Sequence, residues 1–227
     1  MTADATALTT HIDHADHASE LHPPGGIGTP VLGMLLFITS EVMFFAGLFA
    51  AYFSIRAGYT EVVNGTLQHV WPPTAYANLL NPFALTTESG ALNLILPATL
   101  ILILSSATCQ VGVWAIQRDD HRGFVRAFAV TLVLGVTFLL LQAFDYSVLI
   151  REGLTMGATT FGTTYFTLTG FHGAHVFGGV LMLSVVLYRG MAGQFSGKHH
   201  DMVEATSLYW HFVDVVWILL FSVLYLL

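Results

Sequence analysis

Residues 37–53 read FITSEVMFFAGLFAAYF, and residues 169–183 read TGFHGAHVFGGVLML. Both stretches are apolar, yet the first contains Glu41 and the second contains His172 and His175. A helix that crosses a membrane needs about 20 mostly apolar residues, and ionisable groups near its centre are costly in lipid. The two stretches therefore predict membrane spans whose polar groups must face protein.

The whole chain has the composition of a membrane protein. Of its 227 residues, 55% are hydrophobic and only 9% are charged, which fits poorly with a soluble core covered by a polar surface. The seven Lys and Arg residues form no basic patch, which argues against nucleic-acid binding. The single cysteine, Cys109, excludes an internal disulfide, a Cys-x-x-Cys-His haem attachment and a two-cysteine copper site.

Five segments are long and apolar enough to span a bilayer, and they predict an all-α, polytopic bundle of five transmembrane helices. The predicted spans are 31–57, 91–117, 124–150, 160–189 and 203–227. The last three connections are short, so neighbouring helices are expected to pack antiparallel as one domain over residues 30–227. Residues 1–29 form a polar, histidine-rich tail, either solvated or able to chelate a metal or sense pH.

Basic residues near the spans predict the orientation. With the N-terminus inside, the inner loops carry five Lys or Arg residues and the outer side keeps only Arg56 and Arg151. The five inner residues are Arg118, Arg122, Arg126, Arg189 and Lys198. Because positive charge favours the inner side, we expect an inner N-terminus and an outer C-terminus.

Polar groups recur at helical spacing inside the spans. Glu41 lies about ten residues into the first span, roughly 15 Å deep at 1.5 Å per residue, on the aromatic side of the helix that should face protein. In the last span His211 and Asp214 are one turn apart and able to bond each other, and Asp145 lies one turn after Gln142 in the third span.

A ladder of small residues runs along the fourth span. Gly170, Ala174 and Gly178 have the spacing that lets two membrane helices approach closely. His172 and His175 lie on a different face, about 130° away. This pattern predicts a helix packed between two neighbours.

Four functions fit such groups. The first is a proton or ion pathway, although the sequence has no internal repeat and Pro97 alone interrupts a span. The second is haem ligation by His172 and His211 on different helices. The third is a membrane metal enzyme around His199, His200 and Glu204, a cluster better explained as a polar cap of the last span. The fourth is packing against a larger subunit. The residues alone do not decide between the first function, a proton or ion pathway, and the fourth, packing against a larger subunit.

Five pieces of the sequence resemble one family in order and spacing, subunit III of the haem-copper terminal oxidases. They are SEVMFFAGLFAAYF (40–53), WPP (71–73), LGVTFLLLQAFDY (134–146), TGFHGAHVFGG (169–179) and YWHFVDVVWILLF (209–221). The resemblance implies an accessory subunit of cytochrome c oxidase in a bacterial plasma membrane, which packs on subunit I in a complex with subunit II and supports sustained proton uptake and turnover. It implies no metal, no catalytic residue and no bound cofactor in this chain. Haems and copper would lie in partner subunits, and phospholipid would be bound here.

The resemblance also implies roles for single residues. Glu41 matches a buried carboxyl that faces subunit I, and Arg189 matches a basic residue near a lipid phosphate. The family positions matched by His172, His175, Glu204, His211 and Asp214 are interpreted as interhelical polar packing, as is Asp145, where a glutamate is more usual. Many members have seven spans, so this chain resembles the five-span bacterial form. A quinol oxidase subunit III stays the alternative, because the electron donor is decided by subunit II.

Overall fold

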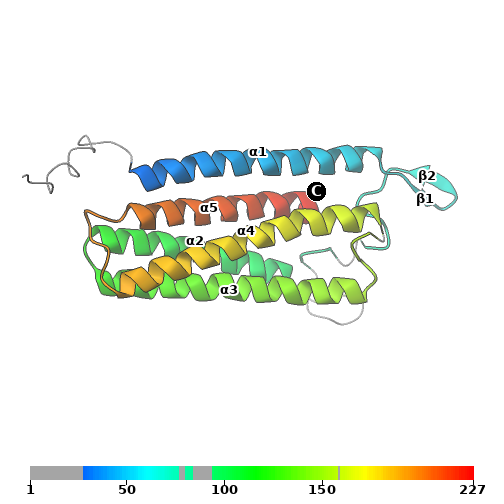
Figure 1. Ribbon diagram of the computed structural model, residues 1–227. Helices are drawn as coiled ribbons and strands as arrows, with labels where there is room; N and C mark the ends of the chain where they lie inside the picture. The colour runs from blue at the N-terminus through cyan, green and yellow to red at the C-terminus, as the bar shows by residue number, and fades with distance from the viewer. Residues whose placement is uncertain (1–27, 77–79, 84–93, 158) are drawn as a thin grey trace, which may run out of the picture.

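Five long helices lie side by side in the structure, a computed structural model that describes residues 28–76, 80–83, 94–157 and 159–227 (Figure 1). They are α1 (Thr29–Gly58), α2 (Ile95–Gln117), α3 (His121–Arg151), α4 (Thr160–Met191) and α5 (Asp201–Phe221), which η1 (Ser222–Leu226) continues. A two-stranded antiparallel hairpin, β1 (Glu61–Val63) and β2 (Thr66–Gln68), follows α1. All five helices are long and apolar enough to cross a membrane, which confirms the predicted fold class. Residues 1–27 of the predicted tail lie outside the described residues.

One predicted interruption is wrong. The second span begins at Ile95, so Pro97 is the third residue of α2 and does not break the helix. Proline is tolerated in a first turn because the amide there has no partner within the helix. Residues 91–93, which we also assigned to this span, lie outside the described residues.

Short connections make neighbouring helices antiparallel. Only residues 118–120 separate α2 from α3, and the Asp120 side chain caps α3 by accepting a 3.0 Å hydrogen bond from the Gly123 amide. The starts of α1, α3 and α5 therefore gather at one end of the bundle, together with the ends of α2 and α4 (Figure 1). This end carries Arg118, Arg122, Arg126, Arg189 and Lys198, whereas Arg56 and Arg151 lie at the other.

The bundle is apolar outside as well as inside. Large aromatic side chains such as Phe124, Phe128 and Trp210 are fully buried, while Met43 is 72% exposed and Leu140 is 66% exposed. A helix that is hydrophobic all round fits a lipid-facing exterior. α1 is the extreme case, since only Phe45 and Tyr52 among its 30 residues are buried.

Glycine provides the close contacts between helices, but not along the ladder we predicted. Ala174 is exposed, and a Cβ at Gly170 or Gly178 would meet nothing closer than 3.5 Å. The close approach falls instead at Gly179, where a Cβ would lie 2.7 Å from Trp210 of α5. Along the predicted ladder the contacts with other helices are looser, since a Cβ would lie 3.5 Å from the Tyr209 hydroxyl at Gly178 and 3.9 Å from the Tyr146 hydroxyl at Gly170.

We expect Gly179→Leu to destabilise the bundle, because the new side chain would have to displace the buried Trp210 ring. Overpacking of this kind costs about 1–3 kcal/mol. Thermal unfolding of the full chain in detergent would measure the change. The control is Gly47→Leu, since a Cβ at Gly47 meets nothing within 4 Å. An equal loss in both variants would contradict the packing described for Gly179.

Candidate functional site

Glu41 of α1 is paired with His175 of α4 within the same chain. Its Oε2 lies 2.8 Å from Nε2 of His175, and the two side chains are 19% and 15% exposed, respectively. The other ring nitrogen, Nδ1, is 2.7 Å from the Phe171 carbonyl oxygen. Glu41 thus faces protein, as its side of the helical wheel predicted. The wheel did not identify this partner, because it gives no rotation of the neighbouring helix.

The geometry fixes how many protons this pair holds. A carbonyl oxygen only accepts hydrogen bonds, so Nδ1 of His175 must carry a proton. The contact between Nε2 and Glu41 then needs one further proton, located either on the carboxyl or on the ring. In both arrangements the pair has no net charge, which suits a site in the middle of a membrane span.

Aromatic rings enclose the histidine of this pair. The Phe45 ring centroid lies 5.0 Å from that of His175, and the Phe44 ring stacks on it at 6.2 Å. On the α5 side, the Tyr209 hydroxyl donates to the His175 carbonyl oxygen at 3.0 Å. The pair is thereby held where α1, α4 and α5 meet, with one edge exposed.

A ladder of polar side chains joins α2 to α5. The indole Nε1 of Trp217 donates to Thr99 Oγ1 and that of Trp210 donates to Ser105 Oγ, each at 3.0 Å. Further along, the ring of His211 lies 3.2 Å from Gln110 Oε1. The sequence analysis missed the α2 side of this ladder, because Thr99, Ser105 and Gln110 are six and five positions apart and do not follow a single helix face.

His211 and Asp214 do not form the hydrogen bond we considered. His211 turns to α2 instead, and Oδ1 of Asp214 has no hydrogen-bond partner among the described residues. The two side chains leave α5 in different directions, because a spacing of three residues still rotates them by about 60°. His211 therefore contacts Gln110 on the neighbouring helix instead of Asp214 on its own helix.

His172 is the most enclosed polar side chain of α4. It is 0% exposed, and neither ring nitrogen has a hydrogen-bond partner among the described residues. Its ring packs instead on Trp217 at 4.8 Å and on Phe138 at 5.9 Å. The residue thus contributes aromatic packing among α3, α4 and α5, without a polar contact.

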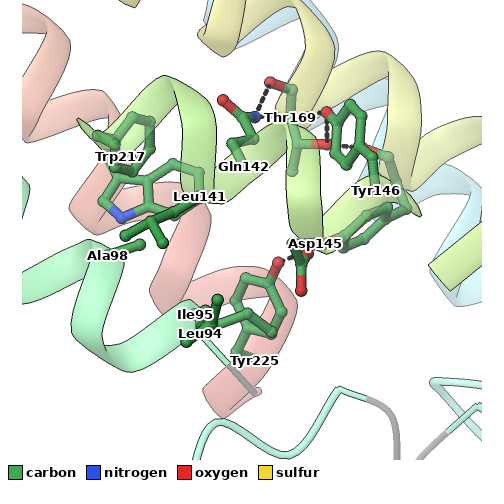
Figure 2. A pocket seen from close by; sticks show the side chains of 12 residues that line it. Leu94, Ile95, Ala98, Leu141, Gln142, Asp145, Tyr146, Thr169, Trp217 and Tyr225 are labelled. Carbon is green, nitrogen blue, oxygen red and sulfur yellow. Dashed lines mark hydrogen bonds between the residues drawn. The ribbon is translucent and has the colours of Figure 1, made fainter. Parts of the chain in front are cut away.

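Asp145 lines a pocket between α2, α3, α4 and the end of α5 (Figure 2). On one side Gln142 donates to the Thr169 carbonyl oxygen at 2.9 Å, and on the other the hydroxyls of Tyr165 and Tyr225 are hydrogen-bonded. Asp145 therefore lies near one end of the bundle in a pocket whose lining is largely apolar, with Gln142, Tyr165 and Tyr225 as polar neighbours.

Two further predicted residues have partners near the opposite end. Arg189 donates from Nε to Gln194 Oε1 at 2.7 Å, and its guanidinium lies over the Phe195 ring at 5.4 Å. Glu204 Oε1 accepts from Gln117 Nε2 at 3.2 Å and lies 3.0 Å from the His200 ring. His199 does not join this cluster by any described contact. No group of three or more His, Cys, Asp or Glu side chains in the described residues is placed to hold a metal ion.

Fold and site together define a polytopic helical membrane protein with a carboxyl–imidazole pair between two of its spans. The family model for cytochrome c oxidase subunit III matches residues 22–227, and the chain belongs to this family. Membership makes it part of an oxidase complex with other subunits. The resemblance found in the sequence is thus confirmed.

Curated relatives carry the same family name. "Probable cytochrome c oxidase subunit 3" of Mycobacterium leprae is 37% identical over 99% of this chain and 98% of its own length. Cytochrome c oxidase subunit 3 of Corynebacterium diphtheriae is 41% identical over 86% of each chain. The protein of that name from Pongo abelii is 38% identical over 85% of this chain, but over only 67% of its own length.

We expect Thr99→Val to destabilise the bundle, because the valine cannot accept the hydrogen bond from the Trp217 indole. An unpaired buried donor costs about 1–3 kcal/mol. The matched control is Thr137→Val, whose hydroxyl is exposed and bonds only the Val133 carbonyl oxygen of its own helix. Thermal unfolding in detergent would compare the two, and equal stability of both variants would show that the ladder does not hold α2 on α5.

Proposed function

We propose that this chain is an accessory subunit of a cytochrome c oxidase, without a redox centre of its own, that packs directly on subunit I beside subunit II. There it supports sustained proton uptake and turnover, and it holds phospholipid. The observation that carries the proposal is the Glu41–His175 pair, because it lies partly exposed on a helix that has little cover of its own.

Exposure of this pair calls for a protein neighbour. Lipid offers no hydrogen bonds, so a carboxyl that is 19% exposed in the middle of a span is poorly placed against acyl chains. The rings of Phe44 and Phe45 cover part of it, but most of α1 around it is exposed. A larger subunit seated on α1 would complete the enclosure. We infer that this neighbour is subunit I.

The other polar residues have a structural role in this proposal. His211 and Glu204 hold helices together through hydrogen bonds, and His172 does so through ring contacts. Asp145 lines the pocket between α2, α3 and α4, and Asp214 is buried on α5. Arg189 is proposed to lie near a lipid phosphate, since no described residue accepts from one of its amino groups. The pair of spans that seven-span members add would not be needed for any of these contacts.

We further propose that the chain lies in a bacterial plasma membrane with its N-terminus inside. Support comes from the grouping of basic side chains, five at the end where α1 begins and two at the other. Cytochrome c is the proposed electron donor of the complex, because the family and its curated relatives bear that name.

Three variants test the role of Glu41. Glu41→Gln should stay bound to subunit I like the parent chain, since the amide still donates to His175 Nε2. Glu41→Leu should be retained poorly, because leucine cannot make the proposed polar contact with subunit I. It should also destabilise the chain itself by about 1–3 kcal/mol, because His175 is left unpaired. The readouts are the amount of this subunit that co-purifies with tagged subunit I and the number of turnovers before activity decays.

The double variant Glu41→Leu/His175→Leu separates two causes. It removes both polar partners, so thermal stability of the chain should recover relative to Glu41→Leu. We expect retention and sustained turnover to stay low, because the contact with subunit I is still missing. If the double variant instead regained full retention and turnover, the pair would serve only internal packing and the proposed contact would be wrong.

A further inference from the structure

Two arginines line a groove where α3 begins and α4 ends. The groove has about 700 Å³ of empty space. Its lining includes His121, Arg122, Val125, Arg126, Met191 and Gly193. Arg122 and Arg126 are four residues apart, so both side chains lie on one side of α3. The groove is thus cationic on the α3 side and apolar at Val125 and Met191.

No described residue neutralises these two arginines. The ion pairs among the described residues join histidines to glutamates, and neither pair includes Arg122 or Arg126. The nearest acids along the chain are engaged with backbone amides: Asp119 Oδ1 accepts from Gly197 at 2.6 Å, and Asp120 Oδ1 accepts from Gly123. The groove therefore carries two positive charges with no acidic partner of its own.

An apolar surface continues from the arginines along the helix. Val130, Val133 and Leu140 follow Arg126 on the same side of α3 and are 47%, 63% and 66% exposed. On its other side Arg126 borders a second groove of about 530 Å³, lined by Thr108, Val111 and Ala127 among others. A ligand that fits both features has an anionic head and apolar chains.

The depth of the site agrees with such a ligand. α3 has 31 residues, so it is about 46 Å long, which exceeds the hydrocarbon thickness of about 30 Å. Its first turn and a half, which holds both arginines, therefore reaches the level of the lipid head groups. The helix N-terminus adds partial positive charge there.

We propose that Arg122 and Arg126 bind the phosphate of an anionic phospholipid, such as phosphatidylglycerol, whose acyl chains lie along the Val130–Leu140 side of α3. Two unpaired guanidinium groups are well suited to phosphate oxygens. This site on α3 is separate from the one proposed for Arg189 at the end of α4, because it uses the side chains of Arg122 and Arg126. It rests on the contacts of this chain alone and does not depend on the proposed role of Glu41.

Lipid titration of the full chain in mild detergent tests the proposal. Phosphatidylglycerol and phosphatidylcholine with the same acyl chains are added separately, and native mass spectrometry counts the bound lipid. Arg122→Gln/Arg126→Gln should bind phosphatidylglycerol about 25-fold more weakly than the parent, since each arginine contributes roughly fivefold near an anionic surface. Its binding of phosphatidylcholine should not change. Both side chains are exposed, so the double variant should keep the parent's thermal midpoint.

Arg151→Gln is the matched control, because it removes a positive charge from the opposite end of α3. It should bind phosphatidylglycerol like the parent. Equal weakening in Arg151→Gln, or no weakening in the double variant, would overturn the proposal, as would a parent chain with no preference for phosphatidylglycerol. Glycerol phosphate at the same concentration should not displace the lipid. If it did, the site would bind a free anion rather than a phospholipid.

Discussion

Hydrocarbon cannot donate or accept hydrogen bonds, and this constraint governs every polar side chain in the bundle. Most Ser and Thr hydroxyls meet it by bonding carbonyl oxygens of their own helix, whereas several larger side chains pair with side chains of other helices. Trp217 bonds Thr99, Trp210 bonds Ser105 and His211 lies against Gln110, so that α5 is fixed to α2 along several turns. These bonds set the register of the two helices, which apolar contacts alone would leave less specified. Once α2 and α5 are in register, α4 and α1 have a defined surface on which to pack.

The Glu41–His175 pair meets the same constraint in a different way. Because His175 Nδ1 donates to the Phe171 carbonyl oxygen, the two side chains share one proton and stay neutral together. Neutrality lowers the cost of leaving the pair partly exposed at the edge of α1. A site at an edge is also a site that a neighbouring subunit can reach, whereas His172, fully enclosed by rings, is closed to any partner.

Hydropathy and breaker residues predicted the five spans well, because length and apolar content are properties of each segment by itself. Contacts between spans were predicted less well. The spacing of His211 and Asp214 was right for a bond within α5, but Gln110 of α2 offered His211 a partner that no pattern within one segment reveals. Likewise, Gly170 and Gly178 have the spacing of a packing ladder, yet the rotation of α4 turns Gly179 toward Trp210. Rotation of each helix about its axis is decided by all its neighbours together.

Acidic side chains at the basic end of the bundle have other partners than the arginines there. At the basic end Asp119 and Asp120 bind backbone amides of Gly197 and Gly123, and Glu204 is engaged by Gln117 and His200. These acids shape turns and cap helices, and among the described residues none of them forms an ion pair with an arginine of α3. A basic end of this kind attracts an anionic membrane surface through particular side chains. The groove beside α3 and the grouping of basic side chains at this end then share one feature, arginines that form no ion pair with an acid among the described residues.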